Sequence, residues 1–276
     1  MISGTDRERA ARRNAQRLLP TLRERSTARL RLYCFHHAGG SPSTYRDWSP
    51  ELPGDVEVVP VLLPGRGLRL REQPYTSMAP LLDGVLTAIE PTLDRPFAFF
   101  GHSMGALVAF ELAHALEASG GVGPLQVFVS ACAPPHRQTA PERRRHDLDD
   151  GSLIRLVKLL GGGGDWSLDD TDIIRRRLPL LRADLAVCET YEVGDRAPLG
   201  CPLTVYGAVN DPIVSVTELD EWRDYTAASF LRRVFPGGHF FLMEHARSQM
   251  LRLLGRELDV LIERHGDPMC LERSAS

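Results

Sequence analysis

A serine with glycine on either side is the residue in this chain best placed to act as a nucleophile. The segment Gly101–Gly105, with the sequence Gly-His-Ser-Met-Gly, follows an apolar run at 96–100 and precedes a helix-like run at 106–118. A small-x-Ser-x-small segment between a strand and a helix is typical of the sharp elbow that presents a catalytic serine. Flanking glycines remove the side chains that would clash in such a turn. We therefore predict that Ser103 attacks a carbonyl carbon.

Two later residues can complete a catalytic triad. A serine hydroxyl is a poor nucleophile at neutral pH and needs a base, and after such an elbow the acid and then the histidine follow in chain order. Asp211 lies in the loop after the apolar run 203–207, and His239 lies on a glycine-rich turn after the run 230–235. We expect His239 to accept the serine proton and Asp211 to orient its imidazole. The alternatives are an aspartate that only caps its own turn and a histidine on a surface loop.

The negative charge that develops on the substrate carbonyl needs two hydrogen-bond donors. The first is expected to be the backbone N–H of Met104, the residue after the nucleophile. The second is expected to be the backbone N–H of Ala38, which precedes Gly39 and Gly40 in the loop after the first apolar run. Small residues let this backbone approach the substrate oxygen closely. The alternative is that the two glycines only form a tight turn.

Apolar runs alternate with helix-like segments along most of the chain. We predict strands at residues 30–35, 56–62, 97–100, 125–130, 203–207 and 230–235, and helices at about 78–93, 104–118, 217–227 and 243–264. Continuous apolar strands separated by helices indicate a mostly parallel sheet covered on both faces. The predicted fold class is therefore α/β, with the site at the carboxyl ends of the strands.

Residues 139–196 interrupt this alternation without a convincing strand. Apolar residues at helical spacing predict two helices, the second kinked at Pro179, and the four glycines at 161–164 must end the first. We interpret this helical insertion as a lid over the site, and an ordinary buried helical hairpin is the alternative. The lid residues expected to contact substrate are Leu156, Leu160, Leu178 and Leu181.

Composition restricts the classes of function. The chain has 276 residues, of which 43% are hydrophobic, enough for one sizeable domain. We place that domain at 29–276, after an Arg-rich polar extension at 1–28 that we interpret as a solvated helix or frayed end, with an interaction arm as the alternative. A net charge of −3 gives no reason to expect nucleic acid or a membrane as partner.

Cysteine usage and the N-terminus suggest a location. The five cysteines are scattered, and neither they nor the histidines have the spacing of zinc ligands, so we expect reduced thiols and no metal ion. No apolar signal region and no run of membrane-spanning length is found. We expect a cytoplasmic protein.

Five motifs in order resemble the type II thioesterases, stand-alone enzymes of polyketide and nonribosomal peptide synthesis. The motifs are His-Ala-Gly-Gly at 37–40, Leu-Pro-Gly-Arg-Gly at 63–67, the elbow at 101–105, Asn-Asp-Pro at 210–212 and Phe-Pro-Gly-Gly-His-Phe-Phe at 235–241. The resemblance extends from about Leu30 to Arg264 and implies an α/β-hydrolase fold with the triad, oxyanion donors and lid named above. Two departures are His36, where the family often has proline, and the glycine-rich segment 161–165.

The resemblance implies a function: removal of unsuitable acyl groups from the phosphopantetheine arm of acyl or peptidyl carrier proteins, through an acyl-serine intermediate. A pantetheine thiol with a pKa of about 8.5 leaves easily as a thiolate, so we expect no cofactor beyond the phosphopantetheine that the substrate carries. The alternatives are a carboxylesterase for small free esters, a product-releasing or cyclising thioesterase and, least expected, a non-catalytic binding protein of this fold. We expect a monomer.

Arginines near the site are candidates for docking the carrier protein, which usually presents an acidic helix. The candidate residues are Arg66, Arg69 and Arg71, or the three arginines at 175–177. The alternative is that these are ordinary solvated arginines, which contribute little energy.

Overall fold

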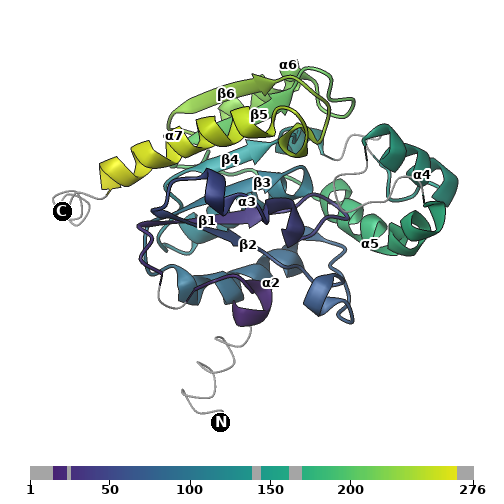
Figure 1. The fold of residues 1–276 in the computed structure, drawn as a ribbon, viewed down its shortest axis with the longest axis horizontal. Coiled ribbons are helices and arrows are strands. Elements are labelled where there is room, and N and C mark those ends of the chain that lie inside the picture. Colours follow the sequence, from purple (N-terminus) through teal and green to yellow (C-terminus); the bar gives the residue numbers. More distant parts are fainter. Residues whose placement is uncertain (1–14, 24–25, 139–143, 162–169, 266–276) are drawn as a thin grey trace, which may run out of the picture.

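A single parallel sheet organises the chain. The computed structural model describes residues 15–23, 26–138, 144–161 and 170–265, without the side chains of residues 171 and 173. The strands are β1 (Leu30–Phe35), β2 (Val56–Pro60), β3 (Phe97–His102), β4 (Val127–Ser130), β5 (Leu203–Ala208) and β6 (Phe230–Phe235). Their order is β2-β1-β3-β4-β5-β6, and every neighbouring pair is parallel (Figure 1). The central strands β1, β3 and β4 therefore end side by side at one edge.

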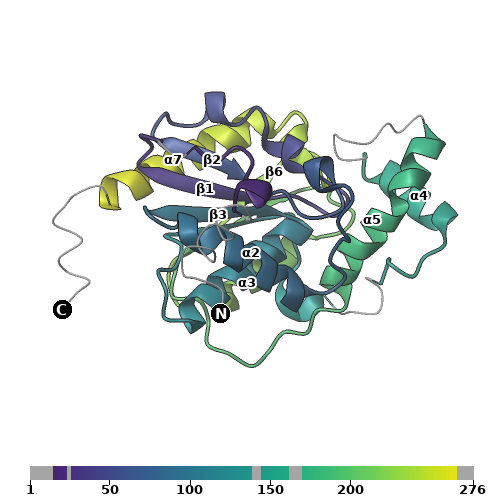
Figure 2. The same cartoon turned by 90° about the horizontal axis from the view of Figure 1, so that it is seen from below.

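Helices cover both faces of the sheet, as the sequence predicted. The helices of the sheet domain are α2 (Met78–Ile89), α3 (Met104–Ala118), α6 (Val216–Asp220) and α7 (Arg247–His265). α2 and α3 lie on one face and α7 on the other (Figure 2). The predicted helices at 78–93 and 217–227 each end as a short 3-10 turn, at 90–92 and 221–225.

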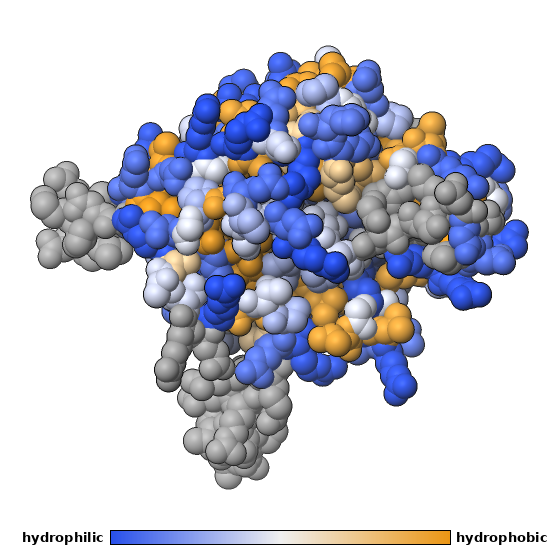
Figure 3. All heavy atoms as spheres, viewed as in Figure 1, coloured by the Kyte–Doolittle hydropathy of each residue, from blue (hydrophilic) through white to orange (hydrophobic). Residues whose placement is uncertain are grey.

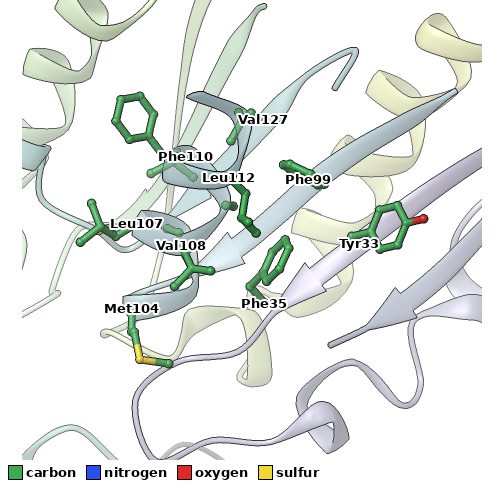
Figure 4. Close-up of a cluster of buried hydrophobic side chains, with 14 of the residues drawn as sticks. Tyr33, Phe35, Phe99, Met104, Leu107, Val108, Phe110, Leu112 and Val127 are labelled. Carbon is green, nitrogen blue, oxygen red and sulfur yellow. The ribbon is translucent and has the colours of Figure 1, made fainter. Parts of the chain in front are cut away.

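Alternate strand residues supply the two cores. Tyr33, Phe35 and Phe99 pack beneath α3 (Figure 4), and the Phe35 and Phe99 rings meet edge to face with centroids 5.5 Å apart. The opposite face of the sheet packs Phe100 of β3 and Phe128 of β4 against α7. Because parallel strands are buried on both faces, they read as unbroken apolar runs rather than as alternating ones.

Strand β3 is longer than predicted. The sequence indicated an end at residue 100, but Gly101 pairs with Phe35 of β1, and His102 pairs with Ser130 of β4. Glycine and histidine have weak strand propensity. A central position with neighbours on both sides supplies the hydrogen bonds that keep them extended, and this brings the strand up to Ser103.

Part of the predicted N-terminal extension packs against the domain. Leu18 and Leu19 are buried in the core that contains α2. The backbone N–H of Leu62 donates to the Leu18 carbonyl at 2.8 Å, which holds this segment beside the end of β2. Residues 1–14 lie outside the described part of the chain.

The helical insertion forms two packed helices, α4 (Asp150–Leu159) and α5 (Thr171–Glu189). Both lie at the edge where the strands end (Figures 1 and 2). α4 ends as predicted at a glycine, since Gly161 takes a φ of +80°, whereas α5 continues through Pro179. Residues 162–169, including three of the four glycines, are outside the described part.

The next features are the polarity of one face of the molecule and the apolar content of the described helices. Hydrophilic residues predominate on the face in Figure 3, with apolar residues in scattered groups between them, as on most globular proteins. None of the helices in the described ranges combines the length and the apolar content that crossing a bilayer requires.

Burial of His114 predicts a loss of stability in acid. The imidazole lies on α3 against Phe110, with ring centroids 4.6 Å apart, and burial lowers its pKa to about 4, with Arg196 acting in the same direction. In the unfolded chain a histidine has a pKa of about 6.5. As the pH falls from 6.5 towards 4, the unfolded chain binds a proton that the folded chain does not, so folding becomes less favourable.

We expect His114→Gln to weaken the pH dependence of the unfolding free energy between pH 7.5 and pH 5. Chemical denaturation at several pH values measures it. The exposed His245→Gln is the matched control and should keep the wild-type slope. Equal slopes in all three proteins would contradict the assignment.

Candidate active site

Ser103 occupies a strained turn between β3 and α3. Its φ of 55° and ψ of −120° lie in a region that residues with a side chain rarely adopt, at a typical cost of about 1–3 kcal/mol. A Cβ atom at Gly101 would lie 2.0 Å from the carbonyl oxygen of Gly105, and one at Gly105 would lie 2.1 Å from that of Phe35. Both glycines are therefore required by the close approach of three backbone segments.

His239 and Asp211 are hydrogen-bonded and buried. The Nδ1 atom of His239 lies 2.8 Å from Oδ2 of Asp211, and the two side chains are 3% and 1% exposed. The other carboxylate oxygen accepts the backbone N–H groups of Ile213, at 2.8 Å, and Val214, at 3.2 Å. Asp211 thus caps its own turn and also holds His239. With Nδ1 donating to the carboxylate, Nε2 is left as the basic nitrogen.

Two loops meet so that this pair can form. The N–H of Asn210, on the loop after β5, donates to the carbonyl of Gly237, on the turn after β6, at 3.1 Å. Gly237 has a φ of +115°, which glycine adopts readily. This contact brings His239 from the turn towards Ser103, and both side chains line one pocket.

His102 is buried beside His239 and bonds to Ser130. Its Nδ1 atom lies 2.9 Å from the hydroxyl of Ser130, and its ring centroid lies 5.3 Å from that of His239. Burial, with smaller contributions from His239 and His37, holds the pKa of His102 well below its ordinary value. A neutral His102 adds no positive charge beside the base.

The two residues that carry the predicted oxyanion donors line the same pocket as Ser103. Ala38 and Met104 both line it, and Met104 is the first residue of α3, where backbone N–H groups lack a partner within the helix. In the loop that carries Ala38, Gly39 has a φ of 71°. A Cβ atom at Gly40 would lie 2.7 Å from the ring of His37. The two glycines therefore shape a loop that side chains would distort.

His36, the departure from the family pattern, is accommodated in this loop. Its Nδ1–H donates to the carbonyl of His37 at 2.9 Å. Burial and the neighbouring Arg66 hold the pKa of His36 well below its ordinary value. The neutral ring bonds to the loop backbone and does not face the predicted triad's pocket.

The pocket lies between the ends of the strands and the helical insertion. Its volume is about 100 Å³, and its wall is mostly apolar. Three of the four predicted lid residues line it: Leu156 of α4, Leu160 directly after α4, and Leu181 of α5. Leu178 is not among the residues that line the pocket, and it is buried in the apolar cluster shared by α4 and α5.

Several pocket residues were not anticipated from the sequence. They are Ala131, Cys132, Ala133, Cys188, Ile213, Val214 and Phe240, together with the polar Gln138, Arg145 and Glu189. Two signals were available in the sequence. Residues 131–133 directly follow β4, and residues 213–214 follow Asp211 and Pro212, so both segments leave the sheet at the edge where the triad was expected.

The docking prediction for Arg66 and Arg69 is wrong, because both side chains are buried. Arg66 forms a bidentate ion pair with Asp184 of α5, with both N–O distances 2.8 Å. Arg69 donates to the Leu62 carbonyl and pairs with Glu72. Arg71 and the first two arginines at 175–177 are exposed.

Within the described ranges, no three His, Cys, Asp or Glu side chains are grouped so that they could hold a metal ion.

A model of the thioesterase domain matches residues 30–258, most of the chain. This chain belongs to the thioesterase family. The family and fold class predicted from the motifs are thereby confirmed.

The thioesterase has relatives and structural neighbours along nearly its whole length. The gramicidin S biosynthesis protein GrsT of Aneurinibacillus migulanus is 37% identical over 237 residues, covering 86% of this chain and 92% of GrsT. RedJ, a thioesterase of the prodiginine biosynthetic pathway in Streptomyces coelicolor, is 46% identical with a TM-score of 0.79, covering 84% of this chain and 86% of RedJ. BorB, the type II thioesterase of the borrelidin biosynthetic cluster, is 34% identical with a TM-score of 0.76. The match covers 85% of this chain and 94% of BorB.

We expect Gly101→Ala to disrupt the elbow of this thioesterase. The added methyl group would meet backbone rather than a movable side chain, so the turn itself must shift. Overpacking of this kind typically costs about 1–3 kcal/mol. The melting temperature should fall, and labelling of Ser103 by a fluorophosphonate should slow at least tenfold.

Gly54→Ala is the matched control, since a Cβ atom there has no neighbour within 4 Å. It should keep both the wild-type melting temperature and the wild-type labelling rate. Wild-type behaviour of Gly101→Ala would show that the elbow tolerates a side chain and would refute the steric argument.

Proposed function

We propose that this thioesterase cleaves acyl groups from the phosphopantetheine arm of carrier proteins in polyketide or nonribosomal peptide synthesis, and so removes unsuitable acyl groups. The observation that carries the proposal is the buried His239–Asp211 hydrogen bond, which lies at the same small apolar pocket as Ser103. The relatives' roles in peptide and polyketide pathways support the carrier-bound substrate.

Acylation begins when Nε2 of His239 removes the proton from the Ser103 hydroxyl. The oxygen attacks the thioester carbonyl carbon, and the carbonyl electron pair moves to the oxygen, which accepts hydrogen bonds from the N–H groups of Met104 and Ala38. Asp211 stabilises the resulting imidazolium. The intermediate collapses by breaking the carbon–sulfur bond, and pantetheine leaves as a thiolate that takes up the proton held by His239. His239 is then neutral again.

Deacylation repeats these steps with water. His239 removes a proton from a water molecule, which attacks the acyl-serine carbonyl. The second tetrahedral intermediate expels the Ser103 oxygen, which regains its proton from His239. The products are a free carboxylic acid and the original enzyme. No electron transfer is involved, and the leaving thiolate needs little acid assistance.

The predicted partner is the carrier protein that delivers the acyl group. With Arg66 and Arg69 buried, the remaining arginine candidates for contact with an acidic helix are the exposed Arg71, Arg175 and Arg176 and the half-buried Arg177. The cytoplasmic location, the monomeric state and the absence of a cofactor stay predictions. The α4–α5 pair is the proposed lid, because residues of both helices line the same pocket as Ser103.

The decisive experiment incubates the enzyme with carrier proteins loaded with different acyl groups and follows deacylation by mass spectrometry. We expect the carrier-bound thioester to react faster than a simple alcohol ester of the same acyl group at matched concentration. Equal rates would favour the carboxylesterase alternative and reject the proposed substrate.

We expect Ser103→Ala to lower kcat for the carrier-bound thioester at least a thousandfold, because loss of the nucleophile removes the covalent route. The exposed Ser77→Ala is the matched control and should keep the wild-type rate. An unchanged rate in Ser103→Ala would remove this residue from its proposed role.

We expect Leu156→Trp to shift the preference towards shorter acyl groups. The indole ring is larger than the leucine side chain and would occupy part of a pocket of only about 100 Å³. The ratio of kcat/KM for hexanoyl-pantetheine to that for acetyl-pantetheine should fall at least tenfold. Leu159→Trp, on the same helix but with Leu159 71% exposed, is the control and should keep the ratio. An unchanged ratio in Leu156→Trp would place the acyl group elsewhere.

A further inference from the structure

The loop that carries Ala38 is held by a residue of the helical insertion. Residues 36–40 follow β1 and belong to no helix or strand. The backbone N–H of Gly39, next to Ala38, donates to Oδ2 of Asp184 at 2.7 Å. Asp184 lies on α5, 145 residues further along the chain. A charged acceptor makes this hydrogen bond shorter and stronger than a neutral one.

Arg66 joins the same contact from a third segment. Its two terminal nitrogens donate to the two oxygens of Asp184, each at 2.8 Å. One of them also donates to the carbonyl of Gly40 at 3.0 Å, and Nε donates to the carbonyl of Pro64 at 3.1 Å. Asp184 therefore binds a backbone N–H group of the loop, at Gly39, and Arg66 binds a backbone carbonyl of the same loop, at Gly40.

Both charges are buried, with Arg66 and Asp184 only 5% and 3% exposed. A buried charge whose partner is removed costs several kcal/mol. If α5 moved away from the sheet domain, Arg66 would lose its carboxylate and Gly39 its acceptor. The position of α5 and the conformation of the loop are therefore coupled by electrostatics.

We propose that Asp184 and Arg66 are positioning residues that fix the oxyanion loop, so that Ala38 can donate to the substrate oxygen only while α5 is packed against the sheet domain. This inference rests on the proposed function, in that it assumes Ala38 N–H as an oxyanion donor. Neither residue touches the substrate. Each acts through the backbone at 38–40, and the helical insertion thereby controls the chemical step as well as access to the pocket.

The test compares Asp184→Asn with wild type in steady-state kinetics on acyl-pantetheine and on a p-nitrophenyl ester of the same acyl group. The asparagine keeps an oxygen acceptor but loses the charge and the bidentate pair. Loss of one oxyanion donor typically costs about 10²–10³ in kcat, so partial misplacement should lower kcat about 10- to 100-fold. KM should change less than threefold, because the oxyanion forms only in the transition state.

Arg66→Lys provides a second variant, which keeps the positive charge but loses the planar guanidinium that binds both carboxylate oxygens at once. It should lower kcat in the same way, and the double variant should be no slower than the slower single variant, because the two residues act as one unit. Asp150→Asn is the matched control. This variant removes the charge of Asp150 on α4, which pairs with Arg182 on α5 at the surface. It should keep kcat within twofold of wild type.

A merely structural ion pair gives a different result. In that case the melting temperature of Asp184→Asn would fall, while kcat at a temperature where the variant is folded would equal that of wild type, and this outcome would overturn the inference. If carrier-bound thioesters are not cleaved but Asp184→Asn still slows the p-nitrophenyl ester, the proposed function fails and the positioning role stands.

Discussion

The close approach of backbone from β1, β3 and α3 is the constraint on which the site depends. At Gly101 and Gly105 the neighbouring carbonyl oxygens lie where a Cβ atom would be. This contact forces the chain to turn within one residue, and Ser103 takes the strained conformation that results. The sheet provides the necessary rigidity, since β3 is hydrogen-bonded to strands on both sides. A large two-sided core thus stabilises a small unfavourable turn.

The parts of the site that follow local rules could be predicted from the sequence. The glycine pattern around Ser103, the aspartate in the loop after β5 and the histidine in the turn after β6 each follow an apolar run, so their placement at one sheet edge follows from parallel topology. The strand ends were less certain, because pairing with two neighbours outweighs the weak propensity of Gly101 and His102. Leu178 shows a related limit, since helical spacing does not tell which apolar residues meet a second helix and which meet the pocket.

Contacts between distant segments could not be predicted. The ion pair of Arg66 with Asp184 joins residues 118 positions apart, and in the sequence each resembles an ordinary surface charge. Charged residues are rarely buried unless paired, so nothing in the local pattern indicated the burial of Arg66. For the wall residues at 131–133 and 213–214, the sequence indicated the sheet edge at which each segment lies, but not that both segments line one pocket. Such walls arise when loops from different strands converge, and no single loop encodes them.

Attachment of Asp184 to the loop at 38–40 also limits how this architecture can be rebuilt. A chimera that takes the whole insertion from a homologue would exchange the pocket wall and, at the same time, a support of the reaction centre. Such grafts should work only when the donor helix has an aspartate at the matching turn and the recipient keeps its buried arginine. Diversification of acyl preference would then proceed more readily through single wall residues than through exchange of the entire helical segment.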